Sequence, residues 1–376
     1  MAVLKLRNHI PIGAPARREP ADGSETPLRV SLGFEPAWFA ERCGVDLGER
    51  FHTDPRLRYR TLEKMKMELV RRFPSVSYWD ASRQDDLATL SGVYGAYPVP
   101  HVFGMPLIYA PDRWPTPDYR RRLSVEEIER LDVETVLGGP AVEELFGQIE
   151  TIQGEWGKVH GYLNWQGVLN NAFALRGQEV FLDMFDKPDL TRHFFSVITE
   201  VIIRLARMVQ ERQRASGFSI DQLSVSNCVM NMISPQVYER FVYPFDRRIA
   251  GSFERFGVHT CNWDVTPYIE VLGRLPNLGY LDMGVMSDLK TVRRAFPYTY
   301  RAVLYSPVAL QDAAPAVLRA DMERIYRELA PCDLVMADIQ ASTPDERVHE
   351  LLAVCRRLET KPPPGRRPGR IRSARS

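Results

Sequence analysis

Short apolar runs of the kind that form buried strands recur along the chain, and most are followed by a segment with helical periodicity. Two early runs, Leu28 to Phe34 and Ser75 to Trp79, are separated by helices that begin near Pro36 and Pro55. Strands that alternate with helices predict right-handed parallel crossovers, and eight of them predict closure into a barrel. After the first two runs, the pattern predicts six more strands, at 158–164, 222–227, 258–262, 278–283, 300–305 and 333–338.

We therefore predict an α/β protein, a (β/α)8 TIM barrel over residues 28–357. An irregular polar arm, residues 1–27, precedes it. Residues 358–376 form a basic tail rich in Pro, Gly, Arg and Ser, which cannot bury apolar surface and is predicted to be disordered. No strand is followed by a G-x-G-x-x-G or G-x-x-x-x-G-K turn, which argues against an open nucleotide-binding sheet.

One segment departs from the alternation. Residues 89–110 are rich in Gly, Pro and aromatic side chains, including the run GVYGAYPVPHVFG. Such a run does not fit a regular barrel helix, so we predict a β-ribbon insertion on the functional face.

Charge and cysteine content narrow the functional classes. Lys and Arg number 49 against 48 Asp and Glu, but six of the cations lie in residues 361–376, so the body is net acidic and unsuited to nucleic acid. No apolar run approaches the roughly 20 residues that span a bilayer. Five cysteines without an apolar leader do not resemble a disulfide framework, and we expect a cytoplasmic protein.

Polar or metal-competent residues end seven of the eight predicted strands. In a barrel of this type the chemistry lies where strands end and loops begin, so these residues are the candidate site. They are Asp80, Asn164 with Trp165, Asn227 with Cys228, His259 with Cys261, Asp282, Tyr305 with Ser306, and Asp338 with Gln340.

The sequence His259-Thr260-Cys261 is the centre of this set. Side chains two apart on a strand point the same way, and imidazole and thiolate are preferred zinc ligands. Cys332 begins the last strand, about 20 Å from the Asp338 end, which removes it as a partner. Cys43 and Cys355 lie within or beside helices and are interpreted as packing residues.

Three stretches resemble the uroporphyrinogen decarboxylase superfamily, and within it the corrinoid-dependent methyltransferases. They are SVSNCVMNMISPQVYERFVYPFDRRI, HTCNWDVTPYIEVLGRLPNLGYLDMG and DLVMADIQASTPDERV. The first is similar to the family's strand, ISPE-type turn and long helix. The second is similar to the methyltransferases' H-x-C-G strand and acidic strand end, and the third to the final strand and its TP helix start.

The resemblance implies a barrel of the uroporphyrinogen decarboxylase and methionine synthase type. It also implies a zinc ion, bound by His-x-Cys and a cysteine near the end of the last strand, that activates a thiol for methyl transfer with a corrinoid. Here the last strand ends in Ala337-Asp338-Ile339, so the third ligand is open between Cys228 and Asp338. We favour Cys228, because thiolates suit zinc and adjacent strands are about 5 Å apart.

The decarboxylase branch of the superfamily fits less well. Its members carry an Arg-rich segment after the first strand, whereas this chain has GFEPAWFAERCG, with acids and aromatics and no such anion cradle. Asp80 does match the position of that branch's central aspartate.

The functional hypothesis is zinc-dependent methyl transfer between a small substrate and a corrinoid (cobalamin), possibly carried by a partner protein, in a chain that can form a homo-oligomer. Asp282 and Asp338 would polarise ligands or bind substrate, and Asp80 would handle a proton. Asn164, Trp165, Asn227 and Tyr305 would contact substrate. The alternatives are a carboxy-lyase acting on a tetrapyrrole or other acid, and a non-catalytic barrel that binds a corrinoid or a partner.

Overall fold

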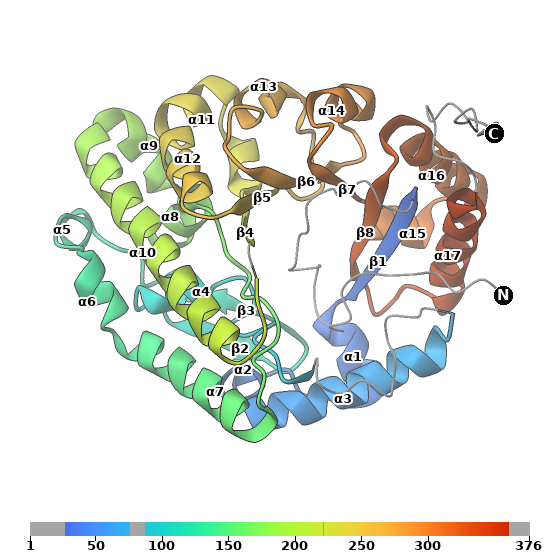
Figure 1. The fold of residues 1–376 in the computed structure, drawn as a ribbon, viewed down its shortest axis with the longest axis horizontal. Helices are drawn as coiled ribbons and strands as arrows, with labels where there is room; N and C mark the ends of the chain where they lie inside the picture. Colours follow the sequence, from blue (N-terminus) through green and yellow to red (C-terminus); the bar gives the residue numbers. More distant parts are fainter. Residues whose placement is uncertain (1–26, 76–86, 221, 361–376) are drawn as a thin grey trace, which may run out of the picture.

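The computed structural model describes residues 27–75, 87–220 and 222–360, and its centre is a six-stranded parallel sheet. The strands lie in the order β1-β8-β7-β6-β5-β4, with helices along the outer face (Figure 1), so the first and last strands are neighbours. The sheet strands are β1 (Leu28–Phe34), β4 (Gln222–Ser226), β5 (Arg255–His259), β6 (Leu278–Gly284), β7 (Tyr300–Leu304) and β8 (Cys332–Ile339), and a separate antiparallel pair is β2 (Leu107–Ala110) and β3 (Arg113–Pro117).

Many of the helices begin at a proline, whose fixed φ and missing N–H suit the first turn. The side chain of Asp54 caps the start of α3 by accepting from the backbone N–H groups of Arg56 and Leu57. Within the described ranges, no helix is long and apolar enough to cross a membrane. The helices are α1 (Pro36–Cys43), α2 (Glu49–Thr53), α3 (Pro55–Arg72), α4 (Pro98–Val102), α5 (Val125–Glu129), α6 (Val133–Leu137), α7 (Pro140–Trp156), α8 (Val168–Arg176), α9 (Glu179–Asp186), α10 (Pro188–Ala215), η2 (Cys228–Met232), α11 (Pro235–Phe241), α12 (Tyr243–Gly251), η3 (Thr266–Tyr268), α13 (Ile269–Leu272), α14 (Leu289–Ala295), α15 (Pro307–Asp312), α16 (Pro315–Leu329) and α17 (Asp345–Glu359).

The predicted strand at 158–164 is extended chain with isolated pairing. His160 makes a single parallel bridge to Thr89, and Gln166, two residues beyond the predicted strand, makes one to Ser226 of β4. Gly161 has a φ of 90°, which interrupts the regular strand conformation. The segment nevertheless lies beside β4, where a barrel would need its third strand.

The strand predicted at 258–262 is displaced. β5 begins at Arg255 opposite Gln222 of β4 and ends at His259 opposite Ser226. Cys261 lies beyond it with a φ of 62°, a left-handed conformation that cannot continue a strand. The helical segment before it consists of α11 and α12, which are divided at Val242, because Pro244 in the first turn of α12 has no N–H to continue the ladder.

The predicted ribbon at 89–110 is also displaced. Most of that segment forms turns and the short helix α4, and positive φ angles at Gly92, Tyr94 and Gly95 turn the chain away from an extended path. The antiparallel pair is β2 and β3, so only Leu107–Ala110 falls inside the predicted range.

Cys332 is the first residue of β8, opposite Leu28 at the start of β1, and is buried. It therefore lies at the end of the strand away from Asp338, as the sequence predicted. Burial raises the pKa of its thiol to about 12. The predictions for residues 1–26, for 76–80 including Asp80, and for 361–376 concern positions outside the described residues.

Candidate metal centre

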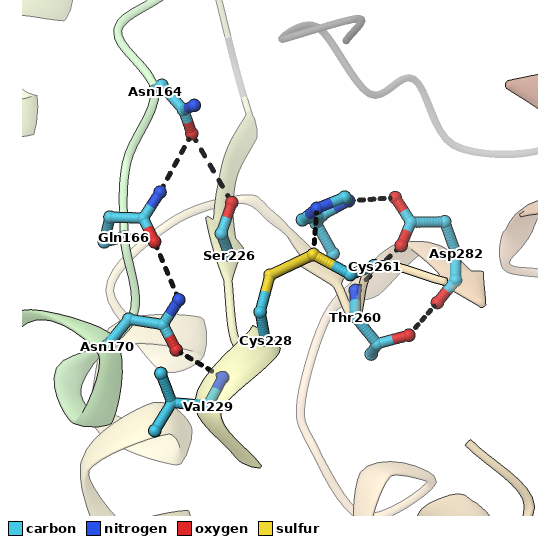
Figure 2. The surroundings of a disulfide bond; sticks show 10 residues. Asn164, Gln166, Asn170, Ser226, Cys228, Val229, Thr260, Cys261 and Asp282 are labelled. Carbon is cyan, nitrogen blue, oxygen red and sulfur yellow. Dashed lines mark hydrogen bonds and ion pairs between the residues drawn. A yellow bond between two sulfur atoms is a disulfide. The ribbon is translucent and has the colours of Figure 1, made fainter. Parts of the chain in front are cut away.

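Two cysteines and one histidine meet at the carboxyl ends of the neighbouring strands β4 and β5. Cys228 begins η2, two residues after β4, His259 is the last residue of β5, and Cys261 follows in the loop. Their ligand atoms all lie within 4.8 Å of one another, and all three side chains are half-buried. His259 Nε2 is 3.2 Å from Cys261 Sγ. Figure 2 shows Cys228 and Cys261 in their surroundings.

The structure joins Cys228 and Cys261 as a disulfide, with Cα atoms 5.6 Å apart. From the sequence we expected these two cysteines to lie together as metal ligands but did not predict a bond between them, because they are 33 positions apart and no framework of cysteines surrounds them. A metal is bound by thiolates, so a metal centre here belongs to the reduced form.

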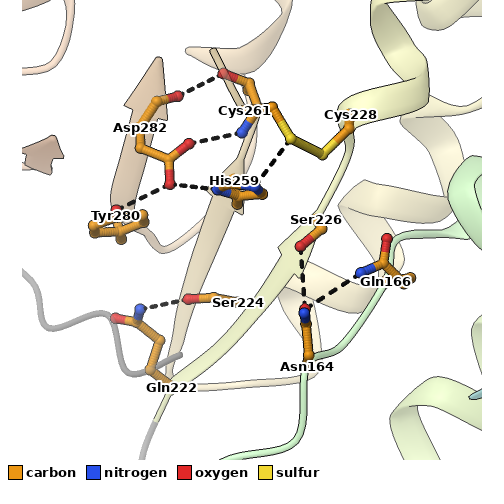
Figure 3. A network of polar contacts seen from close by, with 11 residues as sticks. Asn164, Gln166, Gln222, Ser224, Ser226, Cys228, His259, Cys261, Tyr280 and Asp282 are labelled. Atoms are coloured by element: carbon orange, nitrogen blue, oxygen red, sulfur yellow. Dashed lines mark hydrogen bonds and ion pairs between the residues drawn. A yellow bond between two sulfur atoms is a disulfide. The ribbon is translucent and has the colours of Figure 1, made fainter. Parts of the chain in front are cut away.

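The side chain of Asp282 fixes how His259 faces the two sulfur atoms. Its Oδ2 is 2.7 Å from His259 Nδ1 (Figure 3). Its Oδ1 accepts from the backbone N–H of Thr260 at 2.8 Å. The Tyr280 hydroxyl also donates to Oδ2, at 3.0 Å. With Nδ1 held by the carboxylate, Nε2 is the nitrogen left for a metal.

Asp282 is fully buried, and both of its carboxylate oxygens accept hydrogen bonds from these groups. This position allows Asp282 to polarise His259, which is one of the roles that the sequence predicted for it. The direct contact between Asp282 and substrate, which the sequence also suggested, stays a prediction.

The loop that carries Cys261 is held tightly against the end of β6. The Thr260 hydroxyl donates to the Asp282 carbonyl at 2.6 Å, and Gly284 N donates to the Trp263 carbonyl at 2.9 Å. A Cβ added at Gly284 would meet Asn262 C at 2.6 Å and Trp263 N at 2.7 Å. Since real Cβ atoms do not approach backbone that closely, only glycine lets the loop reach this position.

Asp338 lies across the sheet, on the last strand, where it meets a second acidic residue. It has a φ of 58° and forms a side-chain hydrogen bond with Glu35, which directly follows β1. Burial, followed by the charge of Asp338, raises the pKa of Glu35 to about 7. Burial also raises the pKa of Asp338, although His259 and Glu35 lower it.

Sequence reasoning missed Glu35. The sequence did contain a signal: Glu35 follows the end of the first strand, and the other candidate residues also lie at the ends of their strands. Asp338 is not in the group of three that the described residues bring within metal-binding distance.

The four predicted substrate contacts are placed differently from one another. Asn164 is exposed and accepts a hydrogen bond from Ser226, whose backbone pairs with His259. Trp165 is buried in the core, and the Tyr305 hydroxyl donates to Asp321 of α16 at 2.7 Å.

Asn227 is buried and donates through Nδ2 to Asp246 of α12 at 2.7 Å. The structure thus brings Asn164 close to the candidate ligands and gives the other three packing or anchoring contacts.

Comparison with known proteins identifies the fold alone. No family model matches the chain, and no curated protein matches it. Among solved structures it is similar to a methyltransferase from Methanosarcina mazei, with a TM-score of 0.63 and 16% sequence identity, over 90% of this chain and 95% of that chain. The α/β fold of this chain is therefore shared with a methyltransferase over nearly its whole length.

Proposed function

We propose that the protein is an enzyme that transfers a methyl group between a small substrate and a corrinoid, using a zinc ion held by Cys228, His259 and Cys261. The observation that carries this proposal is the convergence of the three ligand atoms, with His259 aimed at the sulfurs by buried Asp282. The likeness in fold to a methyltransferase supports it. The same likeness, with the parallel bridges at Thr89 and Gln166, supports a closed (β/α)8 barrel of the uroporphyrinogen decarboxylase type.

The donor set fits zinc. Two thiolates and one imidazole are ligands that zinc prefers, and three protein ligands leave a position for a substrate atom. Zinc bound there would lower the pKa of a substrate thiol, so that its anion can attack the methyl carbon. Both ligand cysteines must be reduced, which is consistent with the proposed cytoplasmic location.

Residues of the chain itself orient the metal ligand His259 and provide a contact surface. Asp282 holds the proton of His259 at Nδ1 and so keeps Nε2 free for the metal. Around the same end of the sheet, three large apolar side chains are exposed: Met232 at the end of η2, Met286 in the turn after β6, and Val308 in the first turn of α15. They provide apolar contact surface for the proposed partner, a protein that carries the corrinoid.

Metal analysis of a ligand variant tests the proposal. In reduced protein, Cys261→Ala should lower zinc from about one ion per chain to a trace, because affinity depends on each deprotonated ligand. Cys43→Ala is the matched control, since Cys43 is a free half-buried cysteine at the end of α1, and it should keep its zinc. If Cys261→Ala keeps full zinc and full methyl transfer with methylcobalamin, the proposal is wrong.

Two further variants identify the third ligand. Cys228→Ala should lose zinc as Cys261→Ala does, whereas Asp338→Ala should retain it, because only Cys228 has its ligand atom within 4.8 Å of the other two. The reverse result would assign the third position to Asp338.

A further inference from the structure

The two cysteines of the candidate metal centre lie at matching positions beyond a register pair of β4 and β5. Ser226 of β4 pairs with His259 of β5. Cys228 stands two residues after the first of these, and Cys261 two residues after the second. The Cα atoms of the two cysteines are 5.6 Å apart, and their sulfur atoms are bonded (Figure 2). This Cα separation lies within the range that a disulfide spans without movement of the backbone.

Contacts that involve no sulfur hold both cysteines in place. The residue before each of them is anchored to a buried carboxyl group: Asn227 Nδ2 donates to Asp246 at 2.7 Å, and Thr260 N donates to Asp282 at 2.8 Å. The backbone N–H of Asn227 also donates to the His259 carbonyl at 2.7 Å, which joins the two turns directly. These hydrogen bonds need neither a disulfide nor a metal, so the two sulfur atoms stay within reach of each other in both chemical states.

The other three cysteines of the chain are shielded from oxidation. Cys332 and Cys355 are buried, and burial raises the pKa of the Cys332 thiol to about 12. Burial also raises the pKa of Cys355, and it raises that of half-buried Cys43 to about 11. Because the thiolate is the reactive form of cysteine, these three thiols react slowly with oxidants. Cys228 and Cys261 are half-buried and are thiolates whenever a metal binds them, so an oxidant reaches them first.

We propose that Cys228 and Cys261 are a redox switch on the zinc site: a peroxide converts the two thiolates into the disulfide and releases the ion, and a dithiol reverses the change. This inference rests on the proposed function, which places zinc at these residues. A disulfide sulfur carries no charge, so oxidation leaves His259 as the one intact ligand of the three, which is too few to hold zinc. Disulfides of cytosolic proteins are usually transient ones of this kind.

The oxidation consists of two displacements. One thiolate attacks an oxygen of hydrogen peroxide, the O–O bond breaks, and a sulfenic acid and a hydroxide ion form. The second thiolate then attacks the sulfenic sulfur, so that the S–S bond forms and the S–O bond breaks with loss of a second hydroxide. Two electrons pass from the sulfurs to the peroxide oxygens, and zinc leaves as Zn²⁺ without a change of oxidation state. In the reverse reaction a dithiol returns both electrons and becomes a disulfide itself.

Treatment of the reduced, zinc-loaded protein with hydrogen peroxide tests the proposal. Zinc should fall from about one ion per chain to a trace, read as release to a chromophoric chelator. The thiol count of the subsequently unfolded protein should fall from the five cysteines of the sequence to the three that are free in the structure. Peptide mapping should find Cys228 linked to Cys261. Dithiothreitol followed by added zinc should restore both the thiols and the metal.

Single variants separate this pair from general oxidation. In zinc-free Cys228→Ala, peroxide should form no disulfide within the chain, and Cys261 should stop at the sulfenic acid, which dimedone traps. Cys261→Ala should behave in the same way at Cys228. Cys43→Ala is the matched control: it begins with one thiol fewer and should lose the same two thiols and the same zinc as wild type.

The outcomes distinguish this inference from the proposed function. Zinc and all five thiols retained under a large excess of peroxide overturn the inference, as does a linkage of either residue to another cysteine. Loss of zinc that dithiothreitol and added zinc do not restore also overturns it. In each of these cases the reduced protein still holds zinc at the start, so the proposed function stands. A reduced protein that binds no zinc contradicts the proposed function itself, and the switch with it.

Discussion

At the scale of single residues, the orientation of His259 depends on the buried carboxylate of Asp282. Asp282 accepts from Thr260 N and from Tyr280 and faces His259 Nδ1. These contacts leave the imidazole one orientation, with Nε2 towards the sulfurs. Partners of this kind set the affinity of a metal site although they do not touch the ion.

Substitution of Asp282 measures this effect. We expect Asp282→Asn to weaken zinc binding by about 10- to 100-fold, because a neutral amide holds the ring less firmly and lowers the basicity of Nε2. Tyr280→Phe removes one donor to the same carboxylate and should weaken binding less. Competition against a chromophoric chelator gives both affinities, and unchanged zinc affinity in Asp282→Asn would show that the ring is oriented by other contacts.

Residue type and position at strand ends were enough to find Cys228, His259 and Cys261 from the sequence. The geometry that brings them together was not accessible, because it depends on the left-handed backbone at Cys261. Glu35 was missed because it meets Asp338 only through the pairing of the first and last strands, which no local pattern reveals.

At the scale of elements, a buried carboxyl group connects two helices to the end of β4. Asp246 of α12 accepts from Asn227 at 2.7 Å and from Tyr238 of α11 at 2.8 Å. It is fully buried, and neither of these two partners is a cation. Burial raises its pKa to about 6, although both hydrogen bonds lower it. The turn that carries Cys228 is therefore anchored by a group that folds most favourably when protonated.

This anchor makes stability depend on pH. The unfolded carboxyl group ionises near its ordinary pKa of 3.8, and the folded one near 6, so its contribution is fully present below about pH 4 and is lost as pH rises through 6. The loss is about 3 kcal/mol, from roughly 1.4 kcal/mol for each unit of pKa.

Asp246→Asn keeps an oxygen for both donors and cannot ionise. Between pH 4 and 7, its free energy of unfolding should therefore fall by about 3 kcal/mol less than that of wild type. Urea unfolding at several pH values measures the difference, with Asp189→Asn on the exposed surface of α10 as the control. Parallel pH profiles for wild type and Asp246→Asn would contradict the prediction.

The elements themselves were largely predictable, and their boundaries less so. The alternation of apolar runs located the strands β1, β4, β6, β7 and β8 well, because each is a short buried run between turn signals. β5 was placed about three residues late, because Arg255 and Gly257 interrupt the apolar pattern at its start and the left-handed conformation of Cys261 beyond its end has no sequence signature. The ribbon near 89–110 was displaced because positive φ at Tyr94, a residue that rarely adopts it, has no sequence signature.

At the scale of the whole molecule, the candidate metal centre is set into a core that does not depend on it. One cluster of buried apolar side chains extends from Leu28 on β1 to Leu358 on α17. The three candidate ligands lie at the edge of this cluster, at the ends of strands that the sheet already holds in register.

Removal of zinc should therefore leave the fold intact. Chelation should not change the far-ultraviolet circular dichroism spectrum and should lower the thermal midpoint by only a few degrees, the loss expected from mass action alone. Zinc analysis before and after dialysis confirms removal. A collapse of the helical signal on chelation would mean that the metal is structural.

The pairing of β1 with β8 has a consequence for how the protein is made. Leu28 meets Cys332, so the first strand finds its partner only after about 300 further residues have been synthesised, which takes about 15 to 60 seconds at typical rates. Throughout that time Leu28–Phe34, which is buried along its whole length in the finished sheet, lacks that partner. Nascent chains of this protein are thus exposed to edge-to-edge aggregation on the ribosome, and a chaperone that binds extended apolar segments should raise the yield of folded product.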